Sequence, residues 1–204
     1  MPLVFENKVP ISYRTDFINK VRDISYKLGI NPNWLMGIMD LETGGRFTAD
    51  ITNSLGYTGL IQFGETSAKE LGTTTAKLRK MSAVDQLDYV YKYFMPHKSK
   101  LTSYVDTYLQ VFFPVAVGKG DDFLIQAKGL PAELVAKANR GLDANKNQQI
   151  HVWEVKKALL KRLPSEWLKD GSFSLAIKAY KGYLTIGLLM VGIGSYYLYT
   201  KFKK

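Results

Sequence analysis

The sequence contains no cysteine, which excludes disulfide bonds and thiolate metal sites but leaves the redox compartment undetermined. It also has no recognised nucleic-acid-binding motif and no long run of lysine and arginine. Residues 1–11 lack the basic and apolar regions of a secretory signal peptide. We therefore expect no specific nucleic-acid partner. We also expect that a route other than such a signal would carry the chain out of a cytoplasm.

The composition that remains is that of a globular domain with an appendage. The chain has 204 residues, of which 46% are hydrophobic and 23% charged, so it can bury a core. The formal net charge is +10. This excess exceeds what solubility requires and favours polyanionic surroundings such as an anionic cell wall or anionic lipid.

Apolar spacing predicts a mainly α-helical chain. Residues 13–28 have apolar side chains at helical spacing and are followed by Gly29, which predicts an amphipathic scaffold helix. Ser82 begins a pattern that resembles a capping box, with Asp85 in place of Glu or Gln. Further helices are predicted at Glu65–Leu71, from Ser82 to Pro96, at Thr102–Phe113, at Glu133–Ala138 and at Val155–Leu163.

A helix after Asn31 brings one acidic side chain, Glu42, to its last turn. Asn31 suits the N-cap, Pro32 suits the first helical position, and Gly44 with Gly45 stops the helix. Glu42 continues the apolar stripe of this helix, four residues after Ile38. Desolvation and the negative end of the helix dipole would both raise the pKa of this carboxyl, as a general acid requires. The alternative is a glutamate at a frayed helix end that points to water.

The segment after this helix is rich in turn residues. Asn53 and the run Gly56–Gly59 supply turn chemistry, and Leu60–Phe63 is a short apolar run that contains one amide, Gln62. A hairpin-like excursion beside a helix end would form the wall of a cleft. Gln62 would offer a donor and an acceptor to a polar ligand there.

Three motifs in this order resemble the lytic transglycosylase pattern of the lysozyme superfamily. They are Glu42-Thr43-Gly44-Gly45, then Gly59-Leu60-Ile61-Gln62-Phe63, then Thr66-Ser67-Ala68. The version here is most similar to phage-encoded lysozyme-like proteins, and the resemblance covers roughly residues 12–120. It implies a mainly α, lysozyme-like fold with a small hairpin.

The resemblance also implies an activity on peptidoglycan. Glu42 would act as general acid and then base in cleaving the bond between N-acetylmuramic acid and N-acetylglucosamine, giving a 1,6-anhydro product without a cofactor. The implied glycan-binding residues are Tyr57, Gly59, Leu60, Gln62 and Phe63. The family's Ala-Tyr-Asn-Ala-Gly segment is replaced here by residues 112–118, which lack the asparagine. A hydrolytic lysozyme and a non-catalytic glycan-binding virion protein are the alternatives.

Two other carboxylates lie near these motifs. Glu65 could be a second acid of a two-carboxylate glycosidase, but it is better explained as a helix-start acid stabilised by the dipole. Asp50 could face the cleft, and turn chemistry explains it equally well. The transglycosylase pattern requires neither residue.

Residues 143–154 match an EF-hand calcium loop at most positions. The oxygen ligands would be Asp143, Asn145, Asn147, the backbone carbonyl of Gln149, and Glu154. Gln148 stands where such loops normally need glycine, and only two ligands are carboxylates, so weak calcium binding is expected. The alternative is a metal-free cluster of caps at the start of the next helix.

Residues 182–200 contain no charged residue and are flanked by lysines on both sides. A helix of this length spans about 28 Å, close to the roughly 30 Å of a hydrocarbon core. Tyrosines near both ends resemble an aromatic belt. We expect a transmembrane helix that anchors the chain in a lipid membrane, the alternative being a buried C-terminal helix.

The expected organisation is therefore a lysozyme-like domain at 1–125, a calcium-loop segment at 126–163, a juxtamembrane linker at 164–181 and the spanning helix. An enzyme of this design would lie in the virion membrane of a phage or in a bacterial cell envelope. Other virion proteins are possible partners in the first of these settings.

Overall fold

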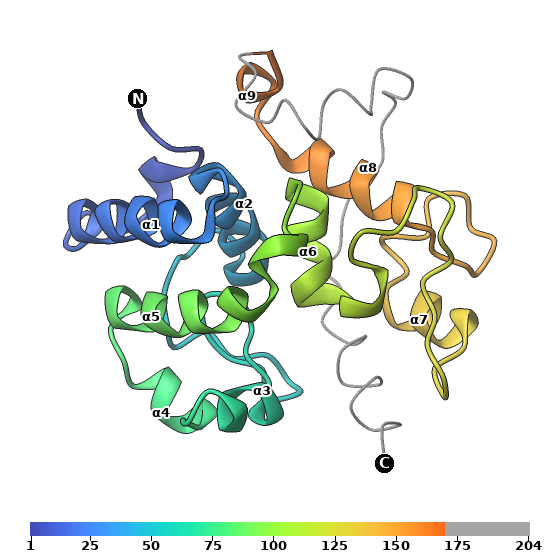
Figure 1. Ribbon diagram of the computed structural model, residues 1–204, viewed down its shortest axis with the longest axis horizontal. Helices are drawn as coiled ribbons and strands as arrows, with labels where there is room; N and C mark the ends of the chain where they lie inside the picture. The colour runs from blue at the N-terminus through green and yellow to red at the C-terminus, as the bar shows by residue number, and fades with distance from the viewer. Residues whose placement is uncertain (170–204) are drawn as a thin grey trace. The chain divides into compact units, whose positions relative to one another are not determined.

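The structure is a computed structural model that describes residues 1–169. The chain is mainly helical and divides into two compact units, Met1–Ser99 and a second that begins at Lys100 (Figure 1). The division falls before the helix at residues 104–112, whereas the sequence placed a domain boundary at 125.

Within residues 1–169, none of the helices has the length and apolar character needed to cross a bilayer. The predicted spanning helix at 182–200 lies outside the described residues, as does most of the predicted linker at 164–181.

The first unit is built on α1, which packs against both α2 and α5 (Figure 1). Its helices are α1 (Arg14–Leu28), α2 (Pro32–Thr43), α3 (Glu65–Glu70), α4 (Thr75–Arg79) and α5 (Ala83–Phe94), with 3-10 turns at Glu6–Lys8 and Met95–Lys100.

The predicted helix ends in this unit are confirmed where local chemistry determines them. Gly29 adopts a left-handed conformation after α1, and the Ser82 side chain accepts a hydrogen bond from the Asp85 N–H at the start of α5. α5 ends at Phe94, two residues before Pro96, as the sequence predicted, and a 3-10 helix continues from Met95 to Lys100. Proline is tolerated near the start of a short 3-10 helix, because a backbone N–H at that position would have no acceptor within the helix.

The N-terminal arm is part of the first unit. Val4 and Val9 are fully buried, and the Val4 N–H donates to Asn33 Oδ1 at 2.9 Å. Lys8 Nζ pairs with Asp40 Oδ1 at 2.7 Å, and this aspartate side chain is only 3% exposed. The arm therefore covers one side of α2 and supplies the cation for a buried acid on it.

The second unit contains α6 (Tyr104–Phe112), α7 (Ala132–Ala138), α8 (Val152–Arg162), α9 (Ser165–Lys169) and a 3-10 turn at Pro114–Ala116. α6 packs against this 3-10 turn and against α8. Ser103 caps α6 through the Asp106 N–H, and the Asp106 side chain in turn accepts from the Gly118 N–H at 2.9 Å. This second contact holds the chain that leaves α6.

Candidate functional site

Glu42 lies in the last turn of α2, and only 7% of its surface is exposed. Asn31 caps the start of the helix by accepting from the Asn33 N–H, and Gly44 ends it in a left-handed conformation with φ 59°. The helix ends were therefore predicted correctly from the sequence. The alternative in which Glu42 points to water is wrong, because the residue is buried.

Thr43 fixes the direction in which the chain leaves Glu42. Its hydroxyl donates to the Met39 carbonyl at 2.6 Å and accepts from the Phe47 N–H at 3.0 Å. Phe47 is fully buried and adopts a positive φ of 52°, an uncommon conformation for an aromatic residue. The backbone directly after the acid is thus set by one hydroxyl and one aromatic anchor.

Residues 51–63 form the hairpin-like excursion expected from the sequence. Isolated antiparallel bridges join Thr52 to Thr58 and Thr58 to Phe63, so the chain reverses twice. The Thr58 N–H donates to the Phe63 carbonyl at 3.1 Å, and the Phe63 N–H returns a bond of 2.8 Å. Gly59 also donates to the Ile51 carbonyl at 2.8 Å. We call residues 51–63 the double hairpin.

The side chain of Gln62 holds the double hairpin together. Its Nε2 donates to the carbonyls of Gly59 at 3.1 Å and Ile51 at 3.4 Å, and its Oε1 accepts from Asn53 Nδ2 at 3.0 Å. The residue itself has φ 51° and is 7% exposed. The structure thus places the Gln62 amide hydrogens inside the segment, whereas the sequence assigned them to a ligand.

Gln86 of α5 anchors the double hairpin to the scaffold, and sequence reasoning missed it. This fully buried amide accepts from the Leu60 N–H at 2.7 Å and donates to the carbonyls of Leu78 at 3.0 Å and Ala49 at 3.3 Å. A Cβ on Gly59 would overlap the same amide, which explains glycine at that position. A polar residue among the apolar core positions of α5 was the available signal.

The remaining predicted glycan-binding residues are packed. Tyr57 is 7% exposed, and its ring lies against Gly64 so closely that a Cβ there would approach it to 2.9 Å. Phe63 is 2% exposed and meets the ring of Tyr93 edge-on at 6.2 Å between centroids. Leu60 is fully buried.

Glu65 is a helix-start acid in the structure, as the sequence favoured. Its Oε2 accepts hydrogen bonds from the Thr75 hydroxyl at 2.7 Å and the Thr75 N–H at 3.0 Å. These bonds to Thr75 lower the pKa of Glu65, so the carboxylate form is favoured. Asp50 is exposed.

The loop at 143–154 adopts a folded conformation held by its own side chains. Asp143 accepts from the N–H groups of Asn147 at 3.1 Å and Gln148 at 2.9 Å. Gln148 has φ 63°, so it adopts the left-handed turn that glycine usually makes at this position. The substitution of glycine by Gln148 therefore does not prevent the turn.

Glu154, the last residue of this loop, is buried and joins the two ends of the loop by hydrogen bonds. It is 1% exposed, and its two carboxylate oxygens accept from the Ala144 N–H at 2.8 Å and the His151 N–H at 2.9 Å. The first and last acids of the loop are thus both directed to loop backbone. This arrangement includes part of the helix cap of the alternative interpretation, since the His151 N–H at the start of α8 donates to Glu154.

The loop has a backbone partner that sequence reasoning did not identify. The Ile125 N–H donates to the Ile150 carbonyl at 2.8 Å, the Val152 N–H donates to the Phe123 carbonyl at 3.1 Å, and a bridge joins Leu124 to His151. The partner of this loop is an irregular segment around residues 123–125 rather than a second loop of the same kind.

The fit of this loop to a cation depends on its amides. Among residues 1–169 no group of three or more His, Asp or Glu side chains is arranged to hold a metal. A cation would therefore need Asn145, Asn147 and the Gln149 carbonyl besides the two acids. Asn145 Oδ1 accepts from the Asn147 N–H at 3.1 Å, and Asn147 Oδ1 accepts from the Gln149 N–H at 3.0 Å. Each of these two oxygens keeps a second lone pair.

No protein-family model, curated protein or solved structure matches this chain.

Proposed function

We propose that this chain is a peptidoglycan lytic transglycosylase with a lysozyme-like fold, in which Glu42 is the catalytic acid and base. The observation that carries the proposal is a glutamate that is 7% exposed in the last turn of a capped helix. The sequence motif that follows it forms the double hairpin, which the Leu60 N–H ties to the scaffold by donating to Gln86 of α5 at 2.7 Å. Burial disfavours the charged form of a carboxyl group, which suits an acid catalyst.

The reaction needs one carboxyl group because the nucleophile belongs to the substrate. Glu42 would give its proton to the glycosidic oxygen as the bond to the anomeric carbon of N-acetylmuramic acid breaks. The resulting carboxylate would take the proton of the 6-hydroxyl of the same sugar as that oxygen bonds to the anomeric carbon. Glu42 ends protonated, and the products are a 1,6-anhydro end and a free 4-hydroxyl.

The residues of the double hairpin would have two roles in this reaction. The buried residues Tyr57, Gly59, Leu60 and Phe63 would act by holding the shape of the double hairpin that lies along the glycan. Gln62 would act as a positioning residue, since its amide braces the hairpin through bonds to Asn53, Gly59 and Ile51. The functional setting we propose is a phage virion membrane or a bacterial envelope.

The test is product analysis with the full chain in a mild detergent. Purified peptidoglycan is digested and the fragments are identified by mass spectrometry. We expect anhydromuropeptides from the unmodified chain and a loss of about 100-fold or more with Glu42→Gln. Glu70→Gln is the matched control, because it neutralises an exposed carboxylate in the same unit, and it should retain activity.

Each other outcome assigns a different function. Reducing-end products that disappear with Glu42→Gln would identify a hydrolytic lysozyme. Binding of glycan without release of any fragment would identify a non-catalytic glycan-binding protein, and the transglycosylase proposal would then be abandoned.

We propose calcium binding by residues 143–154 as a second function. The carrying observation is that Asp143 accepts from the N–H groups of Asn147 and Gln148 while the buried Glu154 closes the loop. Two carboxylates and two amides suggest a dissociation constant of roughly 10⁻⁴–10⁻³ M. Calorimetric titration of the full chain should detect this binding, and Glu154→Gln should abolish it. Glu133→Gln, an exposed change on α7, should leave it intact.

A further inference from the structure

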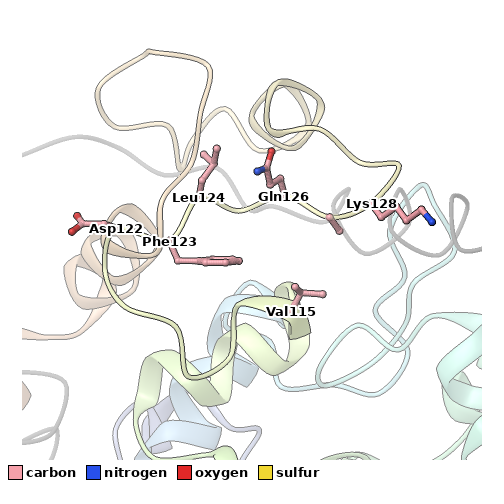
Figure 2. A pocket seen from close by; sticks show the side chains of 7 residues that line it. Val115, Asp122, Phe123, Leu124, Gln126 and Lys128 are labelled. Atoms are coloured by element: carbon pink, nitrogen blue, oxygen red, sulfur yellow. The ribbon is translucent and has the colours of Figure 1, made fainter.

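The second unit has an open hollow of about 710 Å³ beside the 3-10 turn after α6, with Val115 and Phe123 in its lining. Figure 2 shows that the two charged side chains of the lining, Asp122 and Lys128, point out of the hollow in opposite directions. The hollow is therefore an open apolar surface in which no charged group selects a ligand. The first unit, by contrast, has an arrangement that bears directly on Glu42.

The N-terminal arm, residues 1–13, reaches the last turn of α2 at two points. The first is the ion pair of 2.7 Å between Lys8 Nζ and Asp40 Oδ1, and Asp40 lies two residues before Glu42. The Lys8 side chain passes over Gly45, since a Cβ on Gly45 would come within 3.4 Å of Lys8 Cδ and 3.3 Å of Asp40 Oδ1. Residues two apart do not face each other on a helix, so this pair braces the turn from a side of α2 other than that of Glu42.

The second point is a hydrogen bond from Tyr13 to the loop after Glu42. The Tyr13 hydroxyl donates to the Phe47 carbonyl at 2.9 Å, and the Phe47 N–H donates to the Thr43 hydroxyl at 3.0 Å. Both backbone polar groups of Phe47 thus bond to side chains, one from the arm and one from the turn that carries Glu42. Burial, and then the nearby Asp50 carboxylate, raise the pKa of Tyr13, so its hydroxyl stays protonated as a donor.

Arg14, the first residue of α1, holds the arm in the shape that these two contacts require. Its guanidinium donates to the Val9 carbonyl at 2.8 and 2.9 Å and to the Asn7 carbonyl at 3.0 Å. Val9 itself is fully buried. The chain between Lys8 and Tyr13 is therefore a folded part of the first unit, and both side chains have fixed starting points.

We propose that Lys8 and Tyr13 are positioning residues that hold the turn carrying Glu42 in its buried place. The inference rests on the proposed function, in which the Glu42 carboxyl must stay within reach of the glycosidic oxygen. Support is needed because Gly44 and Gly45 both have positive φ and follow the acid closely, and helix ends fray readily beside flexible glycines. The arm anchors the chain both before and after these glycines.

Tyr13→Phe tests the second contact, because it removes one hydroxyl and keeps the ring. The full chain is assayed in mild detergent for release of fragments from purified peptidoglycan. We expect turnover at saturating peptidoglycan to fall about tenfold, while the half-saturating concentration stays within about twofold, since the acid is misplaced but the glycan surface is intact. Tyr26→Phe is the matched control, because Tyr26 is 87% exposed on α1, and it should retain full turnover.

Lys8 variants test the first contact in the same assay, each below its own melting temperature so that turnover reports the folded chain. Lys8→Met should lower turnover about tenfold, and Lys8→Arg should retain most of it, because arginine can also pair with Asp40. Lys27→Met is the matched control, since it breaks an exposed ion pair with Asp23 in the same unit. It should leave turnover unchanged.

Hydrogen exchange of residues 43–50 reports the bracing without an activity assay. We expect amide exchange there to become about tenfold faster with Tyr13→Phe and to stay unchanged with Tyr26→Phe. If the unmodified chain releases no fragment, the proposed function fails, and faster exchange with Tyr13→Phe would still show that the arm holds this turn. Unchanged exchange would overturn the inference in either case.

Two outcomes of the activity assay would overturn the inference while leaving the proposed function intact. One is full turnover in both Tyr13→Phe and Lys8→Met. The other is an equal loss of turnover in the controls Tyr26→Phe and Lys27→Met, which would show that such changes act wherever they are made in the first unit.

Discussion

Two glycines of the double hairpin have nearly the same positive φ but different surroundings. Gly56 has φ 84° with nothing within 4 Å of a Cβ, whereas Gly59 has φ 80° and a Cβ there would overlap the Gln86 amide. Comparing them therefore separates the cost of a left-handed residue from the cost of displacing Gln86.

Gly56→Ala should lower the free energy of unfolding by about 1 kcal/mol, the usual cost of a left-handed alanine. Gly59→Ala should cost at least about 2 kcal/mol, because it also breaks hydrogen bonds of a buried amide. Urea denaturation of the two variants measures the difference. Equal losses would mean that Gln86 moves aside freely and does not anchor the hairpin.

For Gln148 we predict the opposite effect, because introducing glycine there should stabilise the backbone. It adopts φ 63° without being glycine, so Gln148→Gly should relieve about 1 kcal/mol of backbone strain and tighten calcium binding. Gln149→Gly is the control, because Gln149 lies outside the left-handed region and glycine there adds only chain entropy. Calorimetric titration of both variants tests this, and a weaker calcium affinity in Gln148→Gly would contradict it.

Residue-scale prediction from sequence succeeded where one residue determines the local geometry. Asn31, Pro32 and Gly44 fixed the ends of α2, and Ser82 fixed the start of α5, because caps act within three or four residues. The internal partners of Gln62 were not predicted, since the partners of an amide cannot be determined from its own position. Gln86 was missed because its partners lie up to 37 residues away.

At the scale of elements, hydrogen bonds between neighbouring short helices help to fix their positions. Glu65 at the start of α3 accepts two hydrogen bonds from Thr75 at the start of α4, and α3 contacts α4. The sequence did not predict α4, a five-residue helix too short for a periodic pattern. One carboxylate thus joins the starts of two short helices, in addition to their packing through the buried Ala68 and Leu78.

This pair predicts a pH dependence. The bonds to Thr75 depress the pKa of Glu65 below its ordinary value of 4.5. A depressed folded-state pKa stabilises the fold above the unfolded-state value, and this contribution is lost as the pH falls through the folded-state value. Glu65→Gln should therefore reduce stability at pH 7 and have less effect at pH 3, as urea denaturation at both pH values would measure.

Glu70→Gln is the control for this experiment, since Glu70 is an exposed acid on the same helix. Thr75→Val should reproduce the effect of Glu65→Gln, because it removes the hydroxyl that is the largest cause of the lowered pKa. A Glu65→Gln variant whose stability loss is the same at pH 3 and pH 7 would show that the bonds to Thr75 do not stabilise the ionised form.

At the scale of the whole molecule, the positive charge is unevenly divided between the two units. Residues 1–99 contain twelve Lys and Arg against ten Asp and Glu, while residues 100–204 contain sixteen against eight. The net charge of +10 indicated a basic protein, but it did not show that the boundary at Ser99 separates a nearly neutral unit from a basic one. In the proposed enzyme, adsorption to an anionic wall would therefore depend chiefly on the second unit.

This division predicts which lysines bring the chain to its substrate. Adsorption to sacculi that carry anionic polymers should weaken steeply between low salt and about 0.5 M, where the screening length is only a few ångströms. Changing Lys137, Arg140 and Lys161 to Gln should weaken low-salt adsorption more than changing Lys77, Arg79 and Lys80, all six being exposed. A pull-down with sacculi measures both sets. Equal effects would mean that total charge, rather than its location in the second unit, governs adsorption.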